Sequence, residues 1–248
     1  MTIRPFLIAL QFLTQLPVQF SNYPEPQEIG RSLDYYPLVG LLVGVLLAAL
    51  AWLLADVPSL IGAALLLSAW VWLTGGLHLD GLADCADAWV GGLGDRDKTL
   101  AIMKDPRSGP AAVVILVLLL LIKFTALHAI LSAEQWRALL IAPIIGRTVL
   151  PVLFLCTPYV RSKGLGAALS KYKSRHLGFV VAGTVLVLVM IYGFATLWLM
   201  LIASLVLFGV RRLMLKRIGG CTGDTAGALV EVTEIAILLA MVILIQIS

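Results

Sequence analysis

Long runs of apolar residues dominate the chain, and short polar stretches separate them. A helix needs about 20 predominantly apolar residues to cross the hydrocarbon core of a bilayer. The run at 5–20 is shorter and contains Gln11 and Gln15, so it predicts an N-terminal helix that lies at the membrane interface or re-enters. Seven runs approach the required length and predict seven transmembrane helices: 37–55, 58–77, 110–131, 136–156, 177–193, 194–210 and 225–247.

The composition agrees with this pattern. Of the 248 residues, 60% are hydrophobic and 13% are charged, whereas soluble domains average about 45–50% and about 25%. No polar stretch is long enough to form a separate globular domain. We therefore expect an all-α fold, a polytopic integral membrane helical bundle in a single domain over 1–248. Three scattered cysteines without a CxxC pair predict reduced thiols and no cysteine-based metal site.

Lysine and arginine concentrate in alternate loops. Fifteen of the 18 lie in 1–36, 78–109, 157–176 and 211–224, while the intervening turns carry almost none. By the positive-inside rule, this bias predicts a cytoplasmic N-terminus and an outer C-terminus. The net charge of +4 is therefore interpreted as a topology signal, and we expect the lipid bilayer, not nucleic acid, as its partner.

A glycine-led segment at 75–87 carries three acidic residues. Asp80, Asp84 and Asp87 are spaced i, i+4 and i+7, which places them on one helix face within about 40°. Like charges this close repel one another unless a cation lies among them, and oxygen-only ligands favour Mg²⁺ or Mn²⁺ over Zn²⁺. A solvated acidic helix face is the alternative. The apolar neighbours of these acids favour the metal interpretation.

A second segment, 219–234, resembles the first. Each begins Gly-Gly-x-x-x-Asp and has another acid seven residues after that aspartate, Glu231 following Asp224 in this case. The distribution of lysine and arginine, taken without any acidic residue, predicts that Asp80 and Asp224 lie on the same cytoplasmic side. We therefore hypothesise that the two segments face each other and hold one or two Mg²⁺ ions, in an active site on the cytoplasmic side.

Two acids lie inside the last predicted span. A charge there costs roughly 2.5–3.5 kcal/mol on insertion scales, so Glu231 and Glu234 need partners and are functional candidates by default. The alternative is a pair of interhelical salt bridges with Lys123 and Arg147, the two clearly intramembrane cations. Both interpretations can hold together.

A charged turn at 103–110 precedes the third predicted span. The Arg107 guanidinium matches phosphate oxygens in a bidentate way, Lys104 adds charge, and Gly109 lets backbone approach a ligand closely. The alternative is a positive-inside anchor, which the sequence favours equally. His78, beside Asp80, is either a base, a ligand or a hydrogen-bonding residue at a helix end.

At these motifs the chain resembles the cobalamin synthases, also called adenosylcobinamide-GDP ribazoletransferases. The resemblance runs nearly end to end, through 12–18, 37–40, 75–87, 102–109 and 219–231. It implies a bacterial inner-membrane enzyme in which a ribose hydroxyl of α-ribazole, or of its 5′-phosphate, attacks adenosylcobinamide-GDP. The attack occurs at the phosphate that joins aminopropanol to GMP, so GMP leaves and the nucleotide loop is closed.

The site hypothesis combines the acidic clusters with this resemblance. Gln15 and Ala112 stand where the family commonly has arginine and glycine, so we assign no phosphate contact to them. The sequence is compatible with a homo-oligomer. We assign Asp80, Asp84, Asp87 and Asp224 to Mg²⁺, Asp84, Asp224, Glu231 and Glu234 to catalysis, and Lys104, Arg107, Arg147 and Gly109 to substrate phosphate.

Three other interpretations remain at this stage. A CDP-alcohol phosphotransferase carries Asp-x-x-Asp-Gly-x-x-Ala-Arg, but this chain has Leu77 where the first aspartate belongs and lacks the Ala-Arg pair. An ion-coupled transporter would use the intramembrane charges as a relay, yet the acids cluster at the cytoplasmic edge. A structural scaffold gives no reason for acids on aligned helix faces.

Overall fold

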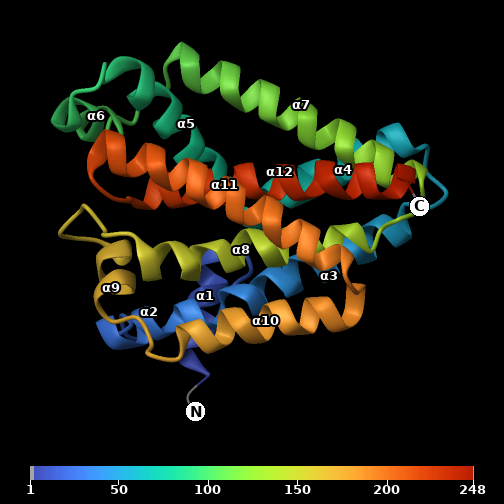
Figure 1. Ribbon diagram of the computed structural model, residues 1–248, viewed down its shortest axis with the longest axis horizontal. Coiled ribbons are helices and arrows are strands. Elements are labelled where there is room, and N and C mark those ends of the chain that lie inside the picture. The colour runs from blue at the N-terminus through green and yellow to red at the C-terminus, as the bar shows by residue number, and fades with distance from the viewer. Residues whose placement is uncertain (1–2, 248) are drawn as a thin grey trace.

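The computed structural model describes residues 3–247, which form a bundle of α-helices (Figure 1). No β-strand occurs in this range, so the predicted all-α class is confirmed. The elements are α1 (Arg4–Leu13), α2 (Pro26–Ser32), the 3₁₀ helix η1 (Leu33–Tyr35), α3 (Tyr36–Leu53), α4 (Ser59–Thr74), α5 (Leu77–Gly91), α6 (Arg96–Ile102), α7 (Pro110–Ser132), α8 (Ala138–Cys156), α9 (Leu165–Lys171), α10 (Leu177–Tyr192), α11 (Ala195–Ile218) and α12 (Gly223–Ile247).

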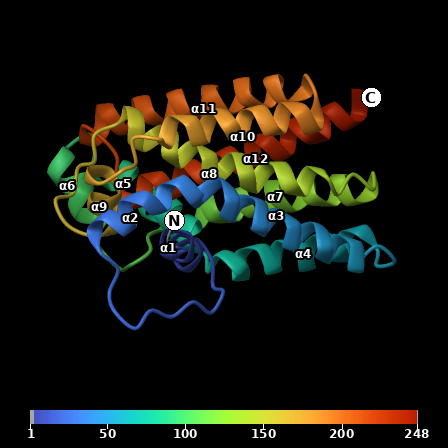
Figure 2. The same cartoon turned by 90° about the horizontal axis from the view of Figure 1, so that it is seen from below.

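The long helices run side by side along the long axis of the molecule. Figure 2 shows α8 and α12 between α10 and α11 on one side and α3 and α4 on the other. The closest packing joins α8 to α3 and α12 to both α5 and α8. At Gly40 of α3, a Cβ atom would lie only 2.5 Å from the Pro143 carbonyl oxygen of α8. Small residues such as Gly40 let two helices approach closely. This matters in a membrane, because apolar burial alone does not favour contact with another helix over contact with lipid.

All seven predicted spans are helical, but the count of seven is not confirmed. Five helical segments are long and apolar enough to cross a membrane: Pro26–Leu53, which joins α2 to α3, and α7, α8, α11 and α12. A sixth exists if α4 and α5 together form one span, although they meet at 87°. Helix α10, with 16 residues, is shorter than these. The chain is therefore a polytopic membrane protein with five or six such segments among the described residues.

Two consecutive glycines produce the bend between α4 and α5. Gly75 and Gly76 have φ angles of 63° and 66°, in the left-handed region that favours glycine. Helix α4 therefore ends at Thr74, and α5 starts in a new direction at Leu77. The predicted span at 58–77 stops early for this reason, and the acidic segment forms a separate helix.

Helix α1 is too short to span a bilayer. Its ten residues measure about 15 Å, against a hydrocarbon core of about 30 Å. It packs on α2 and α3. Its placement at the interface or in a re-entrant position stays a prediction.

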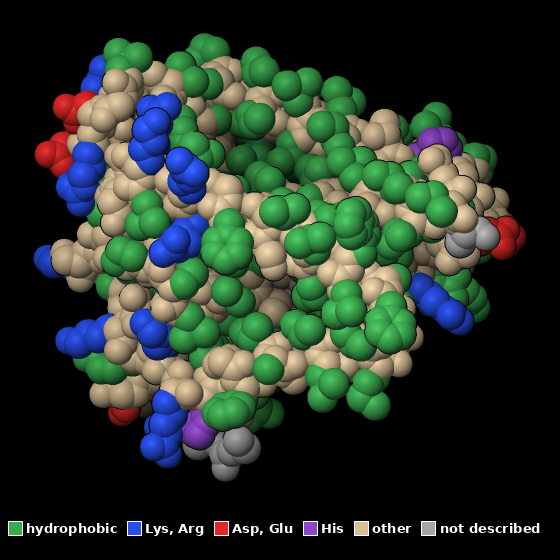
Figure 3. Space-filling view, viewed as in Figure 1, with side chains coloured by type: hydrophobic (Ala, Val, Ile, Leu, Met, Phe, Trp, Pro, Cys, Tyr) green, Lys and Arg blue, Asp and Glu red, His purple; other side chains and the backbone are tan. Residues whose placement is uncertain are grey.

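Basic side chains gather at one end of the bundle. Figure 3 shows lysine and arginine concentrated at the end where α6 and α9 lie, whereas hydrophobic side chains cover the flanks. The same end holds the turn between α11 and α12. The segments that the positive-inside pattern grouped together therefore lie at one end of the molecule.

Candidate active site

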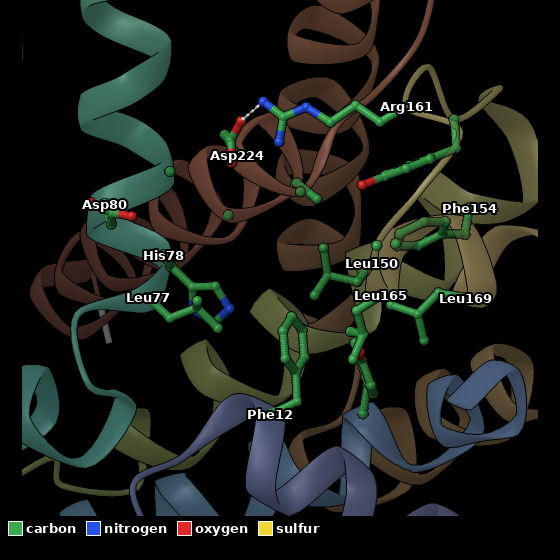
Figure 4. Close-up of a pocket in the computed structure, with 18 of the residues that line it drawn as sticks. Phe12, Leu77, His78, Asp80, Leu150, Phe154, Arg161, Leu165, Leu169 and Asp224 are labelled. Carbon is green, nitrogen blue, oxygen red and sulfur yellow. Dashed lines mark hydrogen bonds and ion pairs between the residues drawn. The ribbon is translucent and has the colours of Figure 1, made fainter. Parts of the chain in front are cut away.

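A pocket of about 290 Å³ opens at the basic end of the bundle. Its wall comes from the beginnings of α5 and α12, the end of α8, the loop between α8 and α9, and α1, α3 and α9. Figure 4 shows Asp80 and Asp224 on one side of this pocket, with His78 nearby. Arg161 and Lys163 also line it. The two acidic segments that the sequence analysis paired thus contribute to the same cavity.

Direct backbone packing holds the two segments together. A Cβ atom at Gly81 of α5 would lie 2.6 Å from the Asp224 carbonyl oxygen and 2.9 Å from its Cα. Only glycine leaves room for this approach. The prediction that 75–87 and 219–234 face each other is therefore confirmed in the described structure.

We expect Gly81→Ala to push α5 away from α12. Overpacking of this kind lowers the free energy of unfolding by about 1–3 kcal/mol, so the midpoint of thermal unfolding in detergent should fall. The matched control is Gly183→Ala on α10, where an added Cβ meets no atom within 4 Å. Equal unfolding midpoints for the two variants would contradict the close packing.

Reciprocal capping fixes the position of Asp224. The Thr222 hydroxyl accepts a hydrogen bond from the Thr225 backbone N–H at 3.2 Å, and the Thr225 hydroxyl accepts one from the Thr222 N–H at 2.8 Å. This arrangement satisfies N–H groups that the start of a helix leaves free. Asp224 therefore sits in the first turn of α12, where the helix dipole favours negative charge.

Arg161 is the direct partner of Asp224. Its Nη2 donates to Asp224 Oδ2 at 2.6 Å, as the dashed line in Figure 4 shows. Two backbone bonds hold the loop of this arginine to the turn before α12: Val160 N–H donates to the Cys221 carbonyl, and Cys221 N–H donates to the Pro158 carbonyl, both at 2.9 Å. The arginine and the aspartate are thus fixed to one another by backbone as well as by charge.

Arg161 and Lys163 were not among the predicted site residues. They were interpreted only as topology signals, because the positive-inside rule does not indicate which basic residue faces a cavity. Gly164 and Gly166 follow directly, and the φ of Gly164 is 95°. Basic residues next to a Gly-x-Gly turn were the available signal for a ligand-binding loop.

Asp84 lies one helical turn after Asp80. Its carboxylate interacts electrostatically with Asp80, Asp224 and Arg161. It does not line the pocket itself, although its spacing places it on the same face of α5 as Asp80. The predicted metal and catalytic roles of Asp84 stay predictions.

Asp87 and Gly109 bind each other. The Asp87 carboxylate accepts hydrogen bonds from the backbone N–H groups of Gly109 and Ala112, the latter at 3.0 Å, and so caps the start of α7. A Cβ atom at Gly109 would lie 2.7 Å from Asp87 Oδ1. This contact gives both residues a structural role, while their predicted metal and phosphate roles stay predictions.

The charged turn at 103–110 lies beside Asp80 but outside the pocket wall. Arg107 donates three hydrogen bonds to the Asp105 carboxylate, two from its guanidinium at 2.6 and 2.9 Å and one from its backbone N–H at 3.1 Å, and its side chain is 86% exposed. These bonds lower the pKa of Asp105 to about 2. Lys104 is exposed. Asp80 and Ser108 of this turn line a second hollow together.

The intramembrane charges form a buried network. Lys123 of α7 donates to Glu231 at 3.1 Å and to Glu234 at 2.7 Å, and Arg147 of α8 pairs with Glu234. Lys123 also lies 4.0 Å from the ring centroid of Trp70. The predicted interhelical salt bridges are therefore confirmed.

None of these four charged residues lines the pocket that contains Asp80 and Asp224. The catalytic roles predicted for Glu231 and Glu234, and the phosphate role predicted for Arg147, stay predictions. The network instead ties α7, α8 and α12 together beneath the pocket.

The cysteines are free, as the sequence predicts. Burial raises the pKa of the Cys221 thiol to about 12. A protonated thiol is a poor nucleophile at neutral pH. Cys221 therefore serves the packing of the loop that carries Arg161.

The carboxylate oxygens at the pocket are ligands of the kind that a hard divalent cation such as Mg²⁺ prefers. Among residues 3–247, no three acidic, histidine or cysteine side chains converge closely enough to enclose a metal ion. Mg²⁺, however, is usually held by one or two carboxylates together with waters and substrate phosphates, not by a complete protein cage. The neighbouring carboxylates of Asp80, Asp84 and Asp224 suit that mode of binding.

Comparison with known proteins agrees over nearly the whole chain. The model of a family described as cobalamin-5-phosphate synthase matches residues 5–242. An adenosylcobinamide-GDP ribazoletransferase of Pseudomonas fluorescens is 59% identical, over 96% of this chain and 98% of the relative. A protein of the same name from Pseudomonas savastanoi is 54% identical, over 97% and 99% respectively. No solved structure matches. The chain belongs to the cobalamin-5-phosphate synthase family.

Proposed function

We propose that this protein is an adenosylcobinamide-GDP ribazoletransferase of the bacterial inner membrane. It joins adenosylcobinamide phosphate to a ribose hydroxyl of α-ribazole, or of α-ribazole 5′-phosphate, and releases GMP. The observation that carries the proposal is the meeting of Asp80 and Asp224 at one pocket, beside Arg161. The names of the relatives point to the same reaction. A CDP-alcohol phosphotransferase and an ion-coupled transporter have no support from these relatives.

In this reaction the hydroxyl oxygen of the ribose forms a bond to the phosphorus that carries the cobinamide. The bond from this phosphorus to the oxygen of GMP breaks, and its electron pair leaves with GMP. A carboxylate of the pocket accepts the proton of the attacking hydroxyl. Arg161 and Lys163 offer the phosphate oxygens hydrogen bonds and positive charge, and the planar fork of the arginine suits them best.

Mg²⁺ is part of this proposal. Asp80, Asp84 and Asp224 would hold it, and it would neutralise the charge that grows on the phosphoryl oxygens during in-line attack. Arg161 balances part of the acidic charge through its bond to Asp224. With a cation at Asp224, the same guanidinium would be free to bind a phosphate oxygen of the substrate.

The orientation follows from the distribution of charge. We propose that the basic end of the bundle, with the pocket, faces the cytoplasm. The cytoplasmic loops of membrane proteins carry an excess of lysine and arginine. Both substrates would then enter from the compartment where nucleotides are made.

Reconstitution in lipid vesicles tests the activity. The purified protein is mixed with adenosylcobinamide-GDP and α-ribazole, and GMP and the corrinoid product are measured by chromatography. We expect both products in equal amounts, and only when both substrates are present. GMP release without the riboside would indicate a hydrolase and would contradict the proposal.

Removing divalent cations tests the metal. We expect EDTA to lower the rate of transfer at least about tenfold, because several kcal/mol of charge stabilisation would be lost. Added Mg²⁺ should restore the rate, and added Na⁺ at equal ionic strength serves as the control. An unchanged rate in EDTA would remove the metal from the proposal while leaving the transfer reaction intact.

A further inference from the structure

The pocket has two chemically different halves. Asp80, Asp224 and Arg161 form the charged half. The other half is apolar and aromatic, and Figure 4 shows the rings of Phe12 and Phe154 in this half. A site for phosphate chemistry alone needs no such apolar half. Its presence indicates a ligand with an apolar portion close to its reacting group.

Two aromatic pairs, together with Leu150, Leu165 and Leu169, form this apolar half. Phe12 stacks on Tyr36, with ring centroids 6.5 Å apart and an angle of 30°, and Phe154 stacks on Tyr159 at 6.0 Å and 24°. They come from α1, α3, α8 and the loop that carries Arg161. Flat aromatic surfaces bind planar rings by stacking. An extended acyl chain has no planar ring and would not stack on these surfaces.

His78 lies between the two halves. It is only 4% exposed, and its Nδ1 has no hydrogen-bond partner among residues 3–247. In Figure 4 its ring points into the cavity between Asp80 and Phe12. A buried polar atom without a partner is costly, and a ligand hydroxyl at this position would remove that cost.

The volume limits what the pocket holds. At about 290 Å³ it is at the lower end of the range of small-molecule sites, roughly 300–1,000 Å³. A nucleoside fits this space, but a corrin macrocycle does not. Guanine carries several hydrogen-bonding groups that phenylalanine and leucine side chains leave unpaired. The base of α-ribazole is dimethylbenzimidazole, which carries one acceptor nitrogen and no N–H.

We propose that this pocket is the subsite for the acceptor nucleoside. The apolar aromatic base lies against Phe12 and Phe154, the ribose lies beside His78, and the reacting hydroxyl points to the Asp80 and Asp224 end. This inference rests on the proposed function and adds which substrate the pocket holds and how the base is selected.

Replacing Phe154 tests the subsite. The assay uses the full protein in lipid vesicles and compares two α-ribosides, one of dimethylbenzimidazole and one of adenine. For Phe154→Ala we expect the KM for the dimethylbenzimidazole riboside to rise on the order of tenfold. The KM for adenosylcobinamide-GDP should stay within about twofold, and the preference for dimethylbenzimidazole over adenine should fall about tenfold. Phe154→Tyr should restore the preference.

Two further variants guard against a folding defect. Phe12→Ala, at a partly exposed position of the pocket wall, should change the same KM in the same direction. Phe179→Ala, at a ring that is 78% exposed on α10, should change neither KM. A rise in the KM for adenosylcobinamide-GDP, or an unchanged base preference in both pocket variants, would overturn the subsite. Failure of the wild-type protein to transfer either riboside would overturn the proposed function itself.

Discussion

Asp224→Asn is expected to lower kcat for ribazole transfer at least about a hundredfold, since that factor corresponds to about 2.7 kcal/mol and a bound metal contributes several. Asparagine keeps the size of the side chain but loses the charge that would attract the proposed Mg²⁺. It also leaves Arg161, only 24% exposed, without its ionic partner. The rate of GMP release at saturating substrates measures the effect.

The matched control is Asp97→Asn on α6. The Asp97 side chain is 90% exposed and makes only a surface pair with Arg96, so its loss should leave the rate unchanged. Asp80→Asn, in the same charged half of the pocket, should resemble Asp224→Asn. Full activity in Asp224→Asn, with a normal unfolding midpoint, would refute the role of the acidic pair in catalysis.

Lys123→Met is expected to lower the free energy of unfolding by about 3–5 kcal/mol, the usual cost of removing one partner from a buried ion pair. Lys123 is 2% exposed and bonds to two carboxylates. Without it, Glu231 and Glu234 share a single cation, Arg147, in the bundle interior. Denaturant unfolding in detergent micelles measures the loss.

A second substitution separates charge balance from packing. In Lys123→Met with Glu231→Gln, one cation and one anion remain, so we expect the double variant to recover part of the lost stability. Lys98→Met, at an exposed position of α6, is the control for lysine removal and should be neutral. Equal instability of the single and double variants would show that the lysine acts by packing alone.

The membrane bundle was predictable from the sequence because the apolar runs are long and the basic loops alternate. The number of crossings was not. Hydropathy registers apolar length but not direction, so it treated 58–77 as one straight span, although Gly75 and Gly76 turn the chain there. Helix α10 is likewise apolar throughout yet only 16 residues long.

The meeting of the two acidic segments was predictable because their motifs are alike and both segments were predicted on the cytoplasmic side of the membrane. The roles of other residues depended on three-dimensional contacts. Spacing placed Asp87 on the face of Asp80, but its oxygens point to the α7 backbone. Arg161 belongs to a loop whose position depends on bonds to Cys221, and no local pattern encodes such a pairing.

The buried charge network has a consequence for how the protein is made. Chains emerge from the ribosome N-terminal end first, so Lys123 and Arg147 are synthesised well before Glu231 and Glu234. Until α12 is translated, the growing chain carries two cations whose counter-ions in this network do not yet exist. Helix α12 therefore completes the electrostatic neutrality of α7 and α8, which are synthesised before it, and assembly of the network has to wait for α12.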